Sequence, residues 1–164
     1  MIEIAKPPSR VCTVDDIKQL EREIGAHLPH DYATFLLRSN GGYCAQGADG
    51  SRSVFDFRVP IYGGLDERGA ITSMYSCGLV ETEGTVFDNI LDMRQAMSHG
   101  DPPIPDGMIP IGETIGSWVI TLGVAGRFRE GVYLNMNRGE MSWEDILLAG
   151  SFTGFEMMVT QRVD

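Results

Sequence analysis

Histidine is scarce in this sequence of 164 residues, and the motifs that organise catalytic or metal-binding side chains are missing. The three histidines accompany no G-x-S-x-G turn and no H-E-x-x-H helix; they are His27, His30 and His99. The 20 glycines form neither a G-x-x-x-x-G-K-[ST] loop nor a strand-linked G-x-G-x-x-G loop. A nucleophile, a base and a group that orients the base cannot be assembled from this set. We therefore expect no enzymatic activity, no cofactor and no metal ion.

Cysteines and long apolar runs are equally limited. Cys12, Cys44 and Cys77 are odd in number and more than 30 residues apart, a spacing that predicts neither a zinc-ligand pair nor a redox pair. Reduced thiols in a cytoplasmic protein are the simplest interpretation. No apolar segment approaches the roughly 20 residues that span a bilayer, and the opening MIEIAKPPSR has no apolar run of the secretory kind. We therefore expect a cytoplasmic protein that does not contact a membrane.

Basic residues are few in the middle of the chain, so the net charge of −10 is unevenly distributed. Residues 61–119 contain two basic and nine acidic side chains, whereas residues 1–60 contain seven and eight. Such a field repels nucleic acid and anionic lipid and attracts a basic partner. The alternative explanation is that these acids only keep the protein soluble.

The chain begins with signals for two helices. Thr13 can cap the first and form a capping box with Asp16, and Gly25 can end it in the left-handed conformation. Pro29 favours the start of a second helix, which the sequence Asn-Gly-Gly at 40–42 should end.

One face of the second helix is apolar. It carries Tyr32, Phe35 and Leu36, which we expect to be buried against a sheet.

Strand and helix signals alternate after residue 42. The segment 51–59 alternates Phe55, Phe57 and Val59 with polar residues, which predicts a half-buried strand. Residues 66–75 are expected to form a short helix. Asp88 is expected to cap a further helix that ends near Gly100.

Residues 107–137 carry the strongest strand pattern, with an antiparallel hairpin at AGRFREG. A last helix is expected from Thr153, with Glu156 completing a capping box. No linker or internal repeat is visible. We therefore predict a single α+β domain over residues 1–164.

The order and spacing of several motifs resemble the SUKH superfamily (the SMI/KNR family). IKQLEREIG at 17–25 is similar to the family's I-x-x-L/F-E-x-x-x-G, and LPHDYATFLLRSNGG at 28–42 is similar to L-P-x-D-Y/F-x-x-F-L followed by N-G-G. A second block looks similar and comprises IPIGETIGSWVITL, GVYLNMN and AGSFTGFEMMV within 109–159. The resemblance excludes 43–86. The chain departs from the family at Ser117, where an acid is common, and at Asn135 and Asn137, where Trp-Asp or Tyr-Asp is common.

The resemblance implies a central antiparallel or mixed sheet flanked by helices. It also implies a non-enzymatic protein-binding role, because bacterial members of that family are typically immunity proteins that sequester toxin domains, often nucleases. Fungal members regulate cell-wall synthesis, so a regulatory or scaffold protein without a toxin partner is the alternative. An enzyme of unrecognised type is a third possibility.

The expected partner is a basic toxin domain, and the expected contact lies in the acid-rich segment. Surface loops vary on a fixed scaffold, so the weak resemblance over 43–86 is typical of a partner-specific surface. Many nuclease domains are basic where they hold phosphates, and an acidic protein can occupy that surface. The candidate partner-binding residues are Asp66, Glu67, Glu81, Glu83, Asp88 and Glu113.

Overall fold

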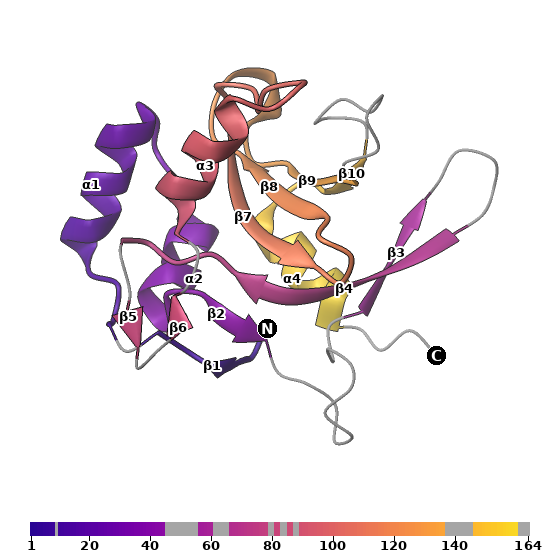
Figure 1. Cartoon of the computed structure of the whole chain (residues 1–164), viewed down its shortest axis with the longest axis horizontal. Coiled ribbons are helices and arrows are strands. Elements are labelled where there is room, and N and C mark those ends of the chain that lie inside the picture. Colours follow the sequence, from indigo (N-terminus) through magenta and orange to yellow (C-terminus); the bar gives the residue numbers. More distant parts are fainter. Residues whose placement is uncertain are drawn as a thin grey trace.

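An eight-stranded antiparallel sheet forms the centre of the molecule (Figure 1). This computed structural model describes residues 1–8, 10–44, 56–60, 66–78, 81–82, 85–86, 89–136 and 146–160. Seven strands follow the order β1-β2-β4-β7-β8-β9-β10, and β3 pairs with β4 beside that path. Their bounds are β1 Ile4–Lys6, β2 Gly42–Cys44, β3 Asp56–Pro60, β4 Asp66–Met74, β7 Met108–Thr114, β8 Val119–Gly123, β9 Val132–Asn135 and β10 Leu147–Ala149. Strands β5 (Glu81–Thr82) and β6 (Thr85–Val86) form a separate two-stranded ribbon. The predicted α+β class is confirmed, and the sheet is antiparallel rather than mixed.

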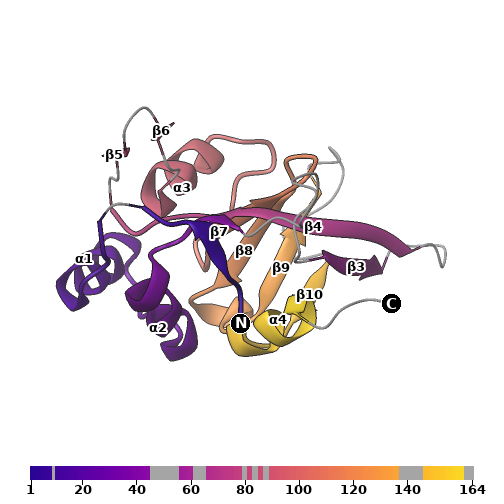
Figure 2. The same ribbon diagram turned by 90° about the horizontal axis from the view of Figure 1, so that it is seen from below.

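Helices lie on both faces of this sheet. Figure 2 shows α3 (Ile90–Ser98) on one face and both α2 (His30–Ser39) and α4 (Phe152–Thr160) on the other. Helix α1 (Val14–Ile24) lies at one end of the sheet, and a short 3-10 turn, η1 (Gly126–Phe128), joins β8 to β9. None of the helices in the described ranges is both long enough and apolar enough to cross a bilayer.

The ends of α1 follow the predicted capping residues. The Thr13 side chain accepts a hydrogen bond from the Asp16 backbone amide, and the Asp16 carboxylate accepts one from the Thr13 amide. Gly25 ends the helix at φ 70°. This reciprocal box satisfies amide groups that the first turn of a helix otherwise leaves without partners.

Asn40 ends α2 and also joins two other segments. Its backbone has φ 50° and is followed by Gly41 at φ 72° and Gly42 at φ 114°, so the predicted stop is confirmed. Its buried side chain accepts a hydrogen bond from the Cys77 amide (2.8 Å) and donates one to the Arg10 carbonyl (3.0 Å). A buried amide that makes these bonds fixes the start of α1 and the end of β4 relative to α2.

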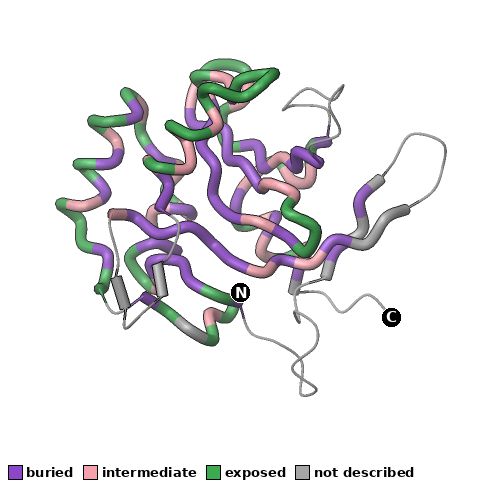
Figure 3. Tube along the Cα trace, in the orientation of Figure 1, coloured by how far each residue is buried: buried purple, intermediate pink, exposed green. Residues whose placement is uncertain are grey.

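An aromatic cluster joins α2 to α4 on one face of the sheet. Tyr32, Phe35 and Phe152 are each 1% exposed or less, and the Phe152 ring centroid lies 4.9 Å from that of Tyr32 and 5.1 Å from that of Phe35. Leu36 is fully buried beside them. The predicted burial of the α2 face is thus confirmed, and Figure 3 shows the buried stretches running through the strands and the inner sides of α1 and α2.

The predicted helix at 66–75 is wrong, because Asp66–Met74 form the strand β4. Ile71, Met74 and Tyr75 have the i, i+3, i+4 spacing of a helix face, but all three are 1% exposed or less within an extended segment. Strand β4 is paired on both edges and covered on both faces near its end, so its apolar residues do not alternate. In its first half β4 pairs with β3, where Phe57 and Val59 are buried as predicted; Phe55 lies outside the described residues.

Two helix starts differ by one or two residues from those predicted. Helix α3 is capped by Asn89, whose side chain accepts a hydrogen bond from the Asp92 amide (2.9 Å), and the predicted cap, Asp88, lies outside the described residues. Helix α4 begins at Phe152, and the Ser151 hydroxyl accepts a hydrogen bond from the Gly154 amide (3.0 Å). Thr153 instead bonds to Asp31 of α2, so it caps nothing.

Candidate partner-binding surface

The candidate partner-binding residues that the structure describes lie on separate parts of the molecule. Asp66 and Glu67 begin β4, where they pair with Pro60 and Val59 of β3. Glu81 is in β5, on the other side of the molecule in both Figure 1 and Figure 2. Glu83 and Asp88 lie outside the described residues. Glu113 is in β7, between these two ends.

Glu113 is a half-buried carboxylate next to the centre of the sheet. Its Cα is paired with Ser73 of β4 on one side and with Val119 of β8 on the other. The Ser73 hydroxyl donates a hydrogen bond to Glu113 Oε1 (3.2 Å), and the Thr72 hydroxyl donates one to the Glu113 carbonyl (3.2 Å). Within the described ranges no Lys, Arg or His forms an ion pair with Glu113. One neutral donor leaves most of the accepting capacity of an ionised carboxylate unused.

Exposed apolar side chains lie near this carboxylate. Tyr43 of β2 is paired with Ser73, so Tyr43, Ser73 and Glu113 form a row across three strands. Neighbouring strands are about 4.8 Å apart, so this row is about 10 Å wide. Tyr43 is 41% exposed, and Ile115, which follows β7, is 52% exposed. The row therefore combines an acid with apolar area, as interface centres do.

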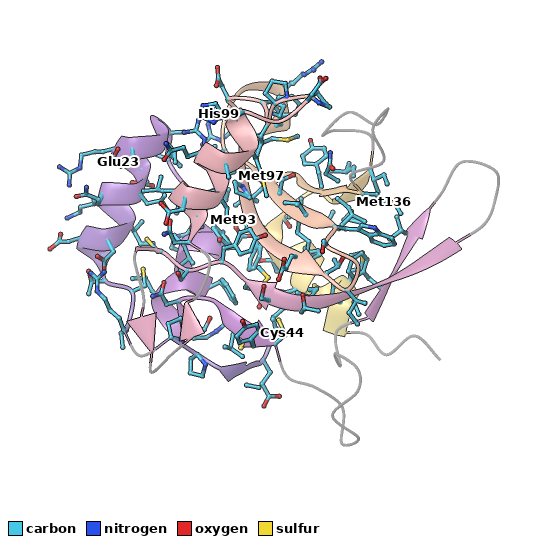
Figure 4. All side chains as sticks on the ribbon, in the orientation of Figure 1. Glu23, Cys44, Met93, Met97, His99 and Met136 are labelled. Atoms are coloured by element: carbon cyan, nitrogen blue, oxygen red, sulfur yellow. The ribbon has the colours of Figure 1, made fainter. Side chains whose placement is uncertain are left out.

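The two ends of the row are more accessible than its centre, since Tyr43 is exposed and Glu113 is half-buried, whereas Ser73 between them is buried. Helix α3 contacts β7 on this face, where Met93 and Met97 point from α3 toward the sheet (Figure 4). Within the described part of the chain, no other helix lies on this side (Figure 2).

All three histidines are exposed. His27 is exposed and lies 3.3 Å from Glu21, and His99 Nδ1 lies 2.9 Å from the Gln95 carbonyl oxygen at the end of α3 (Figure 4). His30 is exposed at the start of α2. Neither the histidines nor the described acids and cysteines form a group of three that could hold a metal ion.

Two open hollows occur on the α1 side of the molecule. The larger, of about 680 Å³, is lined by both acidic and basic side chains of α1, with Gly25, Ala26 and His27 at one end. The other, of about 410 Å³, lies between the end of α1 and η1 and includes Arg94, Asp106 and Arg127. Neither hollow contains any of the candidate partner-binding residues.

The sequence and this arrangement agree with one family. The model of the SMI1 / KNR4 family (SUKH-1) matches residues 11–156. The chain belongs to the SMI1/KNR4 family. The comparison with curated proteins found no match, and neither did the comparison with solved structures.

The family match covers all the elements that form this surface. In this SMI1/KNR4 protein it extends from the residues before α1 to α4, so it includes β2, β4 and β7. It also includes residues 43–86, which the resemblance in the sequence motifs does not cover. The predicted resemblance is therefore confirmed.

The three cysteines are buried free thiols in this structure: Cys12, Cys44 and Cys77. Cys12 and Cys77 are 65 residues apart in the sequence, yet both thiols contact the first turn of α1 in this SMI1/KNR4 protein: Cys12 Sγ lies 3.7 Å from the Thr13 carbonyl oxygen, and Cys77 Sγ lies 3.6 Å from the Asp16 carbonyl oxygen. No local sequence pattern could reveal the second contact, because it depends on the docking of α1 against the end of β4. Asn40, which holds both segments, is the residue that brings the two cysteines to this turn.

Proposed function

We propose that this SMI1/KNR4 protein is a non-enzymatic immunity protein of the cytoplasm that sequesters a basic toxin domain. Its family membership supports a protein-binding role, and its acid-rich segment 61–119 favours a basic partner. In this proposal the acids occupy the toxin surface that would otherwise hold the phosphates of a nucleic acid.

The observation that carries the proposal is the carboxylate of Glu113. It is half-buried, it is held by the Ser73 hydroxyl, and it has no cationic partner in the described ranges. A partly desolvated acid is unfavourable by itself, and an arginine or lysine from a partner would compensate this cost. An arginine could pair with both carboxylate oxygens.

The remaining candidate acids would contribute over a wider area. Asp66, Glu67 and Glu81 lie toward opposite ends of β4 and its neighbours, so a partner that meets them together with Glu113 must cover a long surface. A standard interface buries about 800 Å² on each partner, which suits such a span. Charge would then accelerate association, while Tyr43 and Ile115 at the centre would slow dissociation.

Co-expression tests the function directly. The probe is the C-terminal domain encoded by the reading frame next to this gene, expressed with and without this chain. We expect growth arrest without the chain and full growth with it, together with a stoichiometric complex on purification. Growth arrest in the presence of the folded chain would contradict the immunity role and favour a regulatory or scaffold protein.

A pair of matched variants tests the site separately. Glu113→Gln keeps an acceptor for Ser73 but removes the charge, and Glu23→Gln removes one charge from the exposed side of α1 (Figure 4). We expect Glu113→Gln to weaken the complex about tenfold or more and Glu23→Gln to leave it unchanged. Equal affinity of the two variants would reject the site while leaving the function in place.

A further inference from the structure

The row of residues that contains Glu113 continues onto two further strands. Val119 of β8 is paired with Glu113 of β7 on one side and with Asn135 of β9 on the other. Residues that are paired across antiparallel strands point to the same face of a sheet. Val119 packs in one cluster with Met97 of α3, so this is the face of the sheet on which α3 lies.

A second row lies beside the first, two residues along the strands. Tyr133 of β9 is paired with Thr121 of β8 and with Leu147 of β10. Tyr133 belongs to the same cluster as Met97, so the second row points to the same face as the first. We call Val119, Tyr133 and Leu147 the apolar strip.

The apolar strip is only partly covered by the rest of the molecule. Leu147 is 55% exposed, and Val119 and Tyr133 are half-buried. Helix α3 packs on β7, and β9 and β10 lie beyond it (Figure 1). The opposite face of the same strands is closed, because the residues that alternate with the strip are at most 1% exposed: Ile120, Leu122, Val132 and Leu134.

Apolar side chains are unexpected at these positions. Where one face of an antiparallel sheet is open to solvent, the outward residues are normally polar. A single exposed leucine needs no explanation, but a contiguous apolar surface bordered by polar groups marks an interaction site. The apolar strip is contiguous over three strands, and Glu113 borders it at Val119.

We propose that the partner of this protein covers the apolar strip together with Glu113, so that the interface crosses the sheet from Tyr43 of β2 to Leu147 of β10. This inference rests on the proposed function and specifies the partner further. The partner is a basic domain in which an arginine or lysine lies beside an apolar patch. The cation pairs with Glu113, and the patch packs on the apolar strip.

The width of this surface suits one interface of standard size. Five intervals between neighbouring strands separate β2 from β10 along the order β2-β4-β7-β8-β9-β10. At about 4.8 Å for each interval, the surface is about 24 Å wide. A square patch that buries about 800 Å² is about 28 Å on each side. One partner domain can therefore cover Tyr43, Glu113 and the apolar strip at the same time.

Charge favours a basic partner over a second copy of this chain. Two copies that met through this face would bring their Glu113 carboxylates and their acid-rich segments 61–119 toward each other, and like charges across an interface are unfavourable. An arginine from a basic partner supplies the charge that Glu113 lacks. The apolar contact then acts mainly on the rate of dissociation.

Two matched variants test the inference. Leu147→Gln removes an apolar side chain without a change in net charge. Met157→Gln makes a comparable change at a residue that is 58% exposed on α4, on the other face of the sheet (Figure 2). The probe is the C-terminal domain encoded by the reading frame next to this gene. We expect Leu147→Gln to raise its dissociation rate about tenfold with no change in the association rate or its salt dependence, and Met157→Gln to stay within about twofold.

Hydroxyl-radical footprinting of the unmodified sequence provides a second measurement that needs no variant. The radicals oxidise side chains that solvent reaches, and peptide mapping locates the oxidised residues. We expect the complex to protect Tyr43, Tyr133 and Leu147 from oxidation relative to the free chain. Met157 should be oxidised equally in both.

The outcomes separate this inference from the proposed function. A complex whose dissociation rate is unchanged by Leu147→Gln, with Tyr133 and Leu147 still oxidised, would overturn the inference and leave the immunity role in place. A free chain that is dimeric, and that Leu147→Gln makes monomeric, would show that a second copy covers the strip and would also overturn it. If no complex forms and co-expression still gives growth arrest, the inference and the proposed function both fail.

Discussion

The carboxylate of Asp16 stabilises the start of α1 through several contacts. It accepts hydrogen bonds from the Thr13 amide (2.9 Å) and hydroxyl (2.7 Å) and pairs with Arg10. Burial opposes its ionisation, but the bonds from Thr13 and the charge of Arg10 outweigh burial and hold its pKa below the ordinary value of 3.8. A carboxyl whose pKa is lowered on folding stabilises the protein above its unfolded pKa and loses that effect as the pH falls through its folded pKa.

We therefore predict that Asp16→Asn lowers the free energy of unfolding by about 1 kcal/mol at pH 7. The difference from the original protein should shrink as the pH falls below about 4, where the carboxyl becomes protonated in the unfolded state, and it should be lost as the pH falls through the lower pKa of the folded state. Urea unfolding at a series of pH values measures this. Asp15→Asn, which changes an exposed acid in the same turn, is the control. A difference that stays constant from pH 7 to pH 3 would contradict the assigned contacts.

Phe35 is a buried core residue whose side chain packs within the aromatic cluster of α2 and α4. It is 1% exposed and contacts the rings of Tyr32 and Phe152. We predict that Phe35→Ala lowers the free energy of unfolding by about 3–5 kcal/mol, because transfer energy is lost and a cavity remains. Leu37→Ala, on the exposed side of the same helix, should cost less than about 1 kcal/mol. An unchanged urea midpoint for Phe35→Ala would show that the packing assignment is wrong.

At the scale of elements, α2 is attached to α4 near both of its ends. Asp31 in the first turn accepts hydrogen bonds from the Thr153 amide (2.8 Å) and hydroxyl (3.1 Å). Arg38 in the last turn pairs with Glu156 (3.1 Å), which also accepts a hydrogen bond from the Ile2 amide. The aromatic cluster lies between these two contacts, so the helices are held as a unit.

A double-mutant cycle tests this attachment. We predict that Asp31→Ala and Thr153→Ala each destabilise the protein, and that the double variant loses less than the sum of the two by about 0.5 kcal/mol or more. Thermal or urea unfolding of the four proteins supplies the values. Because alanine keeps the backbone amide of residue 153, additive effects would mean that the bond from the Thr153 hydroxyl to Asp31 contributes no stability of its own.

The sequence allows the prediction of elements whose signals are local. The capping box of α1, the stop at Asn40 and the hairpin between β8 and β9 depend on neighbours within a few residues, and all are confirmed. Strand β4 could not be predicted, because its apolar spacing reflects burial on both faces by elements distant in the sequence. The observed caps, Asn89 and Ser151, differ from the predicted ones because several adjacent residues in each segment can cap a helix. Tertiary contacts, such as the one between Asp31 and Thr153, decide which residue does so.

The candidate site, like the fold, could be predicted from the sequence only in part. The charge distribution predicted Glu113 as one of six candidate acids. Only the structure shows its hydrogen bond from Ser73 and its place in one row with Ser73 and Tyr43.

At the scale of the whole molecule, charge and architecture are separate properties. The buried apolar residues stabilise the fold of the SMI1/KNR4 family. The charge of −7 over residues 61–119 does not contribute to the packing of this core. A charge of this size in one segment raises the rate at which an oppositely charged protein arrives, and salt weakens the effect. The central claim is that this segment meets a basic protein.

The most direct test is the association rate with the product of the neighbouring gene, measured at low and moderate salt. The test variant is Glu81→Lys with Glu83→Lys, and the matched control is Asp15→Lys with Glu23→Lys on α1, which changes the net charge by the same amount. We predict that the test variant associates about tenfold more slowly at low salt and loses most of its salt dependence, while the control keeps both within about twofold. If neither the rate nor its salt dependence changes in the test variant, or if both variants change equally, the acid-rich segment is not the recognition surface.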